Sequence, residues 1–216
     1  KDFPLYFGEK RAGGVDVLTT HVCVGMIIMR NLLVAAAALG IVGSALAQPA
    51  VFTDLGQIDS ISNDYNVADL QVRTSLAGST INWYRFSIGQ NTDPNGVYFD
   101  IDMFATGSTG QVDSEIGVYD FLGNLVANDD DDGHSLRSAL TFGNTTPRTM
   151  PADPFGFTNG LAANGRDGNL LGGQHYWLAV GVFNTTFGAS NWTVTSTGTA
   201  QGDLDINFRT DSVPEP

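Results

Sequence analysis

The sequence predicts an all-β protein, an antiparallel β-sandwich or jelly roll of about eight strands, preceded by a helical signal peptide. From residue 48 onward, short apolar or alternating runs recur and helical periodicity is nearly absent. Gly, Asn, Asp, Ser and Thr separate these runs, and Asp93–Gly96 and Phe121–Asn124 contain the residues that tight turns require. Many short strands joined by such turns indicate a sandwich or a jelly roll.

Residues 26–47 have the three parts of a cleavable secretory signal peptide. Arg30 supplies a positively charged start, and Leu32–Val42 is an apolar run of eleven residues. Ala45 and Ala47 are the small residues that a signal peptidase recognises. A membrane-spanning helix needs roughly 20 apolar residues, so the run is too short for an anchor. We therefore expect cleavage after Ala47 and export of the remainder.

Residues 1–25 are difficult to reconcile with this signal, because a signal peptide belongs at the N-terminus of a chain. The sequence opens with Lys1, whereas Met26 and Met29 stand at the start of the signal. We interpret residues 1–25 as a non-native extension, upstream sequence read in frame, with synthesis starting at one of these methionines.

The sandwich domain is expected at residues 48–209. Its eight predicted strands are rich in β-branched and aromatic residues. They are Ile81–Ile88, Val97–Phe104, Glu115–Tyr119, Asn124–Asn128, Leu136–Phe142, Tyr176–Phe183, Trp192–Ser196 and Leu204–Arg209. Phe52–Ile61 and Asp69–Thr74 are expected as further edge strands. Thr145–Gly173, rich in Pro, Asn and Gly, is expected as a long loop.

Cleavage after Ala47 changes the composition of the chain. It removes three acidic and four basic residues and leaves 20 acidic and 6 basic residues, a net charge of −14. Such a charge argues against nucleic acid and against electrostatic binding to an anionic membrane surface. It is compatible with cations, with neutral sugars, or with simple solubility outside the cell. Cys23 is also removed, so the exported chain has neither a disulfide nor thiol chemistry. Its 169 residues suffice for one domain that is held together by packing alone.

The densest chemical feature is a run of four consecutive aspartates followed by Gly133. Adjacent carboxylates repel one another, and their pKa values rise unless a cation neutralises them. Asn128, Asp130 and Asp132 match the first half of the calcium-loop pattern D-x-[DN]-x-[DN]-G. Ala139 stands where an EF-hand has its closing glutamate, so an EF-hand is not expected. A calcium loop within a β-sandwich and a solvated acidic turn are both compatible with the pattern.

A second group of carboxylates flanks the strand before the aspartate run. In a hairpin, Asp113 and Glu115 would lie at the same end as the aspartates and could complete the coordination of Ca²⁺. The predicted metal ligands are therefore Asp113, Glu115, Asp120, Asn128, Asp130 and Asp132.

Two other patterns have a structural interpretation. Asp100 and Asp102 alternate along one strand, on the face opposite Phe99, and we expect that face to be exposed to solvent. Five aromatic residues could form either a core or a sugar-binding platform, and the usual role of aromatic side chains favours the core. They are Trp83, Phe86, Phe99, Trp177 and Trp192.

Signatures of enzymes are sparse, since neither H-E-x-x-H nor G-x-S-x-G occurs. Of the two histidines in the exported part, His134 lies beside the aspartates and could hydrogen-bond one of them, and His175 begins a strand. We expect no catalytic residue and no bound cofactor other than Ca²⁺. A carboxylate pair that hydrolyses glycosides stays open as an alternative, because the distance between two carboxylates depends on the fold.

Three segments resemble the bacterial pre-peptidase C-terminal-type domain. They are Asp113–Asp120 (DSEIGVYD), Gly123–Asp130 (GNLVANDD) and Tyr176–Gly181 (YWLAVG). The resemblance covers about Trp83 to Phe208. It implies a jelly-roll-like sandwich that accompanies secreted hydrolases or stands in surface proteins, with calcium bound in some members, and hence a non-catalytic role.

Residues 210–216 are expected as a polar tail. The last four, Val213–Pro216, are similar to the start of a PEP-CTERM sorting signal. In that signal the motif precedes a hydrophobic helix and a basic cluster, so we interpret the chain as truncated at the motif; a chance match is the alternative.

Together these features predict an exported protein, extracellular or attached to the cell surface, that is not an enzyme. We expect a calcium-stabilised sandwich with a binding or structural role in the extracellular matrix. The expected partners are extracellular polysaccharide or surface proteins, with sorting machinery at the membrane if the terminal signal is genuine. The alternative is a secreted polysaccharide hydrolase that uses a carboxylate pair.

Overall fold

The computed structural model describes residues 47–59, 67–89, 98–105, 112–143, 148–149, 162–163 and 167–211. All of them belong to one compact unit, Val42–Pro216. The predicted signal peptide up to residue 46 and the predicted tail after residue 211 lie outside the described residues. Within the described ranges every regular element is a β-strand, and none contains a helix able to cross a membrane.

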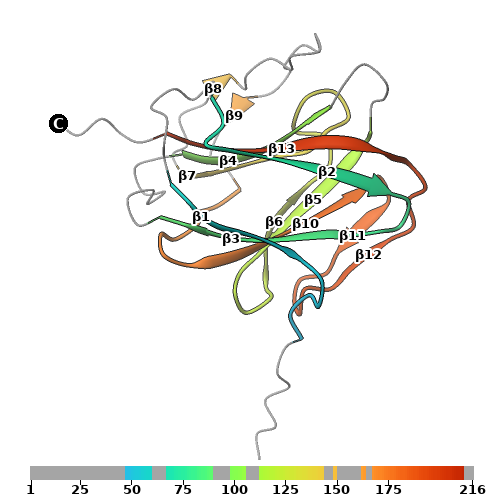
Figure 1. The fold of residues 1–216 in the computed structure, drawn as a ribbon, viewed down its shortest axis with the longest axis horizontal. Coiled ribbons are helices and arrows are strands. Elements are labelled where there is room, and N and C mark those ends of the chain that lie inside the picture. Colours follow the sequence, from blue (N-terminus) through green and yellow to red (C-terminus); the bar gives the residue numbers. More distant parts are fainter. Residues whose placement is uncertain are drawn as a thin grey trace, which may run out of the picture. The chain divides into compact units, whose positions relative to one another are not determined.

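The strands form two large sheets, which Figure 1 shows as two layers. A five-stranded sheet has the order β1-β3-β10-β5-β6, and a four-stranded sheet has the order β2-β13-β4-β7. Their bounds are β1 Thr53–Ile58, β2 Leu70–Ala77, β3 Asn82–Ile88, β4 Tyr98–Ala105, β5 Ser114–Tyr119, β6 Leu125–Asp129, β7 Ala139–Gly143, β10 His175–Val182 and β13 Gln201–Asp211. The prediction of an all-β sandwich is confirmed.

Two short ribbons complete the described strands. β11 (Thr185–Phe187) pairs with β12 (Val194–Ser196), and β8 (Arg148–Thr149) pairs with β9 (Ala162–Ala163). The expected long loop therefore contains one of these ribbons, and most of it lies outside the described residues.

One strand pair departs from the antiparallel pattern. β1 runs parallel to β3, whereas the other pairs of the two large sheets are antiparallel. The chain leaves the five-stranded sheet after β1, forms β2 in the other sheet, and returns as β3. No hairpin turn joins β1 to β3, so nothing local dictates their relative direction.

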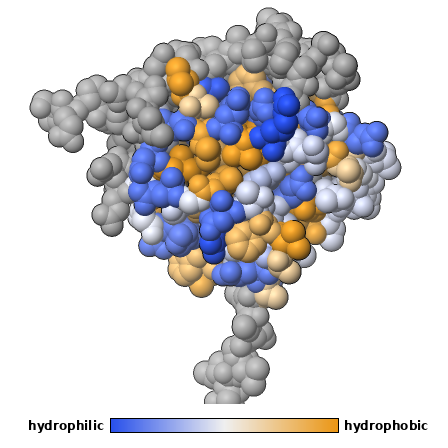
Figure 2. Space-filling model, in the orientation of Figure 1, coloured by the Kyte–Doolittle hydropathy of each residue, from blue (hydrophilic) through white to orange (hydrophobic). Residues whose placement is uncertain are grey.

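Apolar side chains from the two inner faces form the main core. The ring of Phe86 on β3 stacks at 5.6 Å on Phe99 of β4 and lies 5.5 Å from Phe208 of β13. All three side chains are fully buried. Leu55 of β1 and Val72 of β2 are only partly buried where they pack against this core. Figure 2 shows an apolar patch on the face in view, bordered by hydrophilic residues.

A second apolar cluster covers the outer face of the five-stranded sheet. It is built on Tyr119, Trp177 and Trp192, and the β11–β12 ribbon packs against it. Gly117 makes this approach possible, because a Cβ there would lie 2.4 Å from the ring of Phe187. The prediction that the aromatic residues are core is thus confirmed for Trp177 and Trp192, as it is for the two Phe residues of the inner faces. Trp83 is partly exposed.

Several strands begin or end at other residues than predicted, and two of these differences have a visible cause or geometry. Trp192 lies in a turn with a φ of 49°, and β12 begins only at Val194. β13 continues to Asp211, two residues beyond the predicted end. The carboxylate of Asp69 holds this end, because it accepts hydrogen bonds from the backbone N of Thr210 at 2.6 Å and from its Oγ1 at 2.7 Å.

The expectation that Asp100 and Asp102 face solvent is wrong. Their exposed fractions are 0 % and 1 %. The two residues do share the outer face of β4, but other side chains cover that face: His134, from the connection between β6 and β7, packs at 4.9 Å against Phe104 on the same side of the strand. Alternation along a strand establishes which residues share a face, and not what lies on it.

Candidate metal centre and a buried polar network

The β5–β6 hairpin brings two parts of the sequence together. Its antiparallel register pairs Ile116 with Asp129, so the residue before β5 lies beside those that follow β6. Oxygen atoms of Asp113, Asp130 and Asp131 all lie within 4.8 Å of one another as a result. These three carboxylates form the candidate metal centre.

The electrostatics of this centre are unfavourable to three negative charges. Burial raises the pKa of Asp113, and repulsion from Asp130 and Asp131 raises it further. The pKa of Asp130 is raised for the same reasons, burial first and the charge of Asp131 second. The Oδ1 atoms of Asp113 and Asp130 are inaccessible to solvent and have no hydrogen-bond partner among the described residues. These two oxygens therefore have unused capacity as acceptors.

Asp129 organises the loop and is not one of the three carboxylates of the candidate centre. Its Oδ2 accepts hydrogen bonds from the backbone N of Asp132 at 3.0 Å and of Ala139 at 2.8 Å, so it ties both ends of the loop together. Burial raises the pKa of Asp129 to about 7. The calcium-loop pattern treats this position as an unspecified residue, and the prediction missed its role; an aspartate that ends a strand before a tight loop was the available signal.

Gly133 is required by the packing of this loop. Its backbone N donates to the carbonyl O of Arg137 at 2.8 Å, and a Cβ at residue 133 would lie 2.5 Å from the same oxygen. The loop then joins the start of β5, where the backbone N of Ser138 donates to Oγ of Ser114 at 3.1 Å. The loop is thus anchored to both sheets.

The structure brings some of the predicted ligands together and separates others. Asp113 and Asp130 belong to the centre, as predicted, and Asp131 joins them although it was not predicted. Glu115 borders the centre, but its carboxylate accepts hydrogen bonds from the backbone N of Asn184 at 3.1 Å and of Thr185 at 2.6 Å. Glu115 therefore holds the turn between β10 and β11.

Asp120 lies at the other end of β5. It follows Asp113 by seven positions, which corresponds to roughly 20 Å along an extended strand. Its Oδ1 accepts from the backbone N of Leu122 and of Asn124, both at 2.8 Å, and so shapes the hairpin turn. The two other predicted ligands, Asn128 and Asp132, are exposed at the end of β6 and in the loop.

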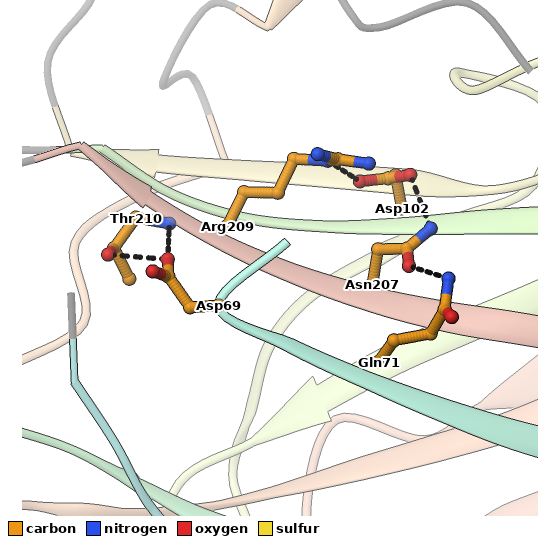
Figure 3. A network of polar contacts seen from close by, with 6 residues as sticks. All are labelled: Asp69, Gln71, Asp102, Asn207, Arg209 and Thr210. Atoms are coloured by element: carbon orange, nitrogen blue, oxygen red, sulfur yellow. Dashed lines mark hydrogen bonds and ion pairs between the residues drawn. The ribbon is translucent and has the colours of Figure 1, made fainter. Parts of the chain in front are cut away.

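Polar side chains of β13 contact side chains from the neighbouring strands β2 and β4, as Figure 3 shows. Asp102 accepts hydrogen bonds from Nε of Arg209 at 2.8 Å and from Nδ2 of Asn207 at 3.3 Å. Asn207 in turn accepts from Nε2 of Gln71 at 2.8 Å, which leads from the interior to the surface at β2. Burial raises the pKa of Asp102, and the ion pair with Arg209 opposes this shift only in part.

The same network reaches the loop that carries the candidate metal centre. The guanidinium of Arg209 lies 5.6 Å from the ring centroid of Phe104, against which His134 packs. His134 and Arg137 are fully buried, so the loop presents carboxylates outward and these two residues inward. His134 therefore lies within the fold. The other histidine, His175, begins β10 as predicted.

Comparison with known proteins adds little. No family model matches the chain, and no curated protein matches it. Among solved structures, the chain is similar to the crystal structure of Aeromonas hydrophila PliG, a periplasmic lysozyme inhibitor of g-type lysozyme. The two are 10 % identical, the match covers 74 % of this chain and 100 % of that chain, and the TM-score is 0.31. We draw no functional argument from a likeness at this level.

Proposed function

We propose that this protein is an exported, non-catalytic β-sandwich that Ca²⁺ stabilises and that has a binding or structural role outside the cell. The observation that carries the cation part is the group Asp113, Asp130 and Asp131, with oxygens within 4.8 Å of one another. The exported chain has a charge of −14 and no lysine, which suits it to cations and to neutral partners.

The chemistry of the donors fits Ca²⁺. All three side chains offer hard carboxylate oxygens, which Ca²⁺ binds in sets of six to eight together with carbonyl and water oxygens. The Oδ1 atoms of Asp113 and Asp130 have no hydrogen-bond partner among the described residues. A bound cation would give these atoms a partner and offset the mutual repulsion of the carboxylates. Its contribution is structural, since it would fix the loop that joins the two sheets.

Three carboxylates of the described residues are held by hydrogen bonds within the fold, which supports the non-catalytic part of this proposal. Asp102 is engaged by Arg209 and Asn207, Asp129 by the backbone of its own loop, and Glu115 by the β10–β11 turn. Each of these carboxylates has a structural task. The resemblance to pre-peptidase C-terminal-type domains and the sorting motif at the end of the sequence belong to the same proposal. N-terminal sequencing of the secreted product tests export, and Gln48 is the expected first residue.

Thermal unfolding of the exported protein in Ca²⁺ and in EDTA tests the cation claim. At a Ca²⁺ concentration 100 times the Kd, binding adds about 2.7 kcal/mol to the free energy of unfolding. For a domain of this size that corresponds to a rise in Tm of about 5–10 °C. Isothermal titration with Ca²⁺ and with Mg²⁺ compares the two ions directly.

Two variants form a matched pair for this experiment. Asp130→Asn removes a carboxylate from the centre and should abolish most of the Ca²⁺-dependent rise in Tm. Asp120→Asn lowers the Tm because it weakens the hairpin turn, but it should leave the Ca²⁺-dependent rise unchanged. An absent response to Ca²⁺ in the wild-type protein, or an equal loss of response in both variants, would refute the assigned centre.

A further inference from the structure

Four side chains gather on the outer face of the five-stranded sheet, at the edge formed by β1 and β3. Trp83 and Arg85 are two positions apart on β3, so their side chains share one face of the sheet. The strand register pairs Arg85 with Trp177 of β10 and with Asp54 of β1. Phe52 comes from the segment that leads into β1 and packs on Trp177 with ring centroids 4.8 Å apart. Two segments of the chain, about 30 residues apart in sequence, thus build one surface.

The base of this surface is rigid. Trp177 and Tyr119 are buried to 1 % and 0 % exposure, and Trp83 lies 5.7 Å from the ring of Tyr119. The guanidinium of Arg85 lies 5.0 Å from the ring centroid of Phe52 and forms an ion pair with Asp54. The four upper side chains are therefore held in place before any ligand arrives, which reduces the entropy lost on binding.

The upper side chains also stay accessible. The exposed fractions are 37 % for Phe52, 34 % for the side chain of Arg85 and 47 % for that of Asp54, and Trp83 is partly buried. The surface combines aromatic rings with a planar donor and a carboxylate acceptor.

This combination matches the chemistry of a sugar ring. The C–H faces of a pyranose pack on aromatic rings, and its hydroxyl groups exchange hydrogen bonds with guanidinium and carboxylate groups. The net charge of the exported chain, −14, repels polyanions, which favours an uncharged polysaccharide over an acidic one. We propose that Phe52, Asp54, Trp83 and Arg85 form a binding site for a neutral polysaccharide; the inference rests on the proposed function, because it names the ligand class of the binding role.

Affinity electrophoresis of the exported protein tests this site. The gels contain dextran, galactomannan or mixed-linkage β-glucan as neutral probes, and alginate as an anionic probe. We expect at least one neutral polysaccharide to retard the wild-type protein and alginate to have no effect. Arg85→Gln and Asp54→Asn change exposed polar groups and should weaken retention about tenfold, because a sugar hydroxyl loses a charged partner.

Variants of the aromatic residues complete the experiment. Trp83→Ala should abolish retention and Trp83→Phe should restore part of it. Phe183→Ala is the control, since Phe183 is 48 % exposed but lies beside Asp113, away from the proposed site. The proposal is overturned if none of the neutral polysaccharides retards the wild-type protein, if only alginate does, or if Phe183→Ala weakens retention as much as Arg85→Gln. The Tm in Ca²⁺ is recorded separately, so failure of the sugar site leaves the cation claim standing, and the reverse also holds.

Discussion

The buried ion pair between Asp102 and Arg209 allows a quantitative prediction about stability. Their side chains are 1 % and 6 % exposed and the Oδ1–Nε distance is 2.8 Å. Arg209→Met keeps much of the length of the side chain but leaves the carboxylate of Asp102 buried without its cation. Removing one partner of a buried pair costs about 3–5 kcal/mol, whereas domains of this kind have a total stability of roughly 5–15 kcal/mol. We therefore expect Arg209→Met to lose a large fraction of the free energy of unfolding.

Urea unfolding followed by tryptophan fluorescence measures this loss, and the chain offers a matched control. Arg73 and Asp205 form a surface pair at 3.5 Å, in which the Arg73 side chain is 64 % exposed. Arg73→Met should cost at most about 1 kcal/mol, because solvent screens the pair. The double variant Asp102→Asn with Arg209→Met removes the stranded charge and should recover part of the loss.

The pH dependence of Arg209→Met provides an independent check. Burial already raises the pKa of Asp102, and without the guanidinium it rises further. The native state then binds a proton at a pH at which the unfolded chain does not, so stability is lost as the pH rises through the folded pKa. The loss in free energy of unfolding that Arg209→Met shows relative to the wild-type protein should therefore become smaller as the pH falls toward the ordinary pKa of aspartate. If Arg209→Met loses no more stability than Arg73→Met, or if its deficit is the same at all pH values, the reasoning is refuted.

Two further predictions concern the loop between β6 and β7. Because burial raises the pKa of Asp129 to about 7, the free energy of unfolding in EDTA should decline as the pH rises from about 4 to about 7. Asp129→Asn should flatten that decline in chemical unfolding at several pH values, and an unchanged slope would contradict the assignment. Gly133→Ala places a Cβ 2.5 Å from the carbonyl O of Arg137 and should cost about 1–3 kcal/mol in urea unfolding. Gly168→Ala is the opposite case, because its Cβ would meet nothing within 4 Å and its φ is 118°, so it measures backbone strain without a steric clash.

Local patterns in the sequence were sufficient for most of the architecture. The run Tyr176–Phe183 is continuously apolar and is followed by Asn184, and the observed strand β10 differs from that prediction by one residue at each end. The proximity of Asp113 to Asp130 also followed from the sequence, because both flank one hairpin whose turn is encoded by neighbouring residues. These features depend on contacts between residues close in the chain.

Contacts between distant segments could not be predicted in this way. The parallel pairing of β1 with β3 depends on a strand that crosses to the other sheet between them. The buried carboxylate of Asp102 is paired with Arg209, which is 107 residues away in the sequence. The two-residue alternation of side chains along β4 predicts only that Asp100 and Asp102 share a face. The sequence alone determined that this protein is a β-sandwich with an acidic loop at one hairpin end. Only the tertiary structure decided which carboxylates accept hydrogen bonds within the fold and which gather at the candidate centre. The reason is that the donors, such as the backbone N of Thr185 that binds Glu115, come from segments distant in the sequence.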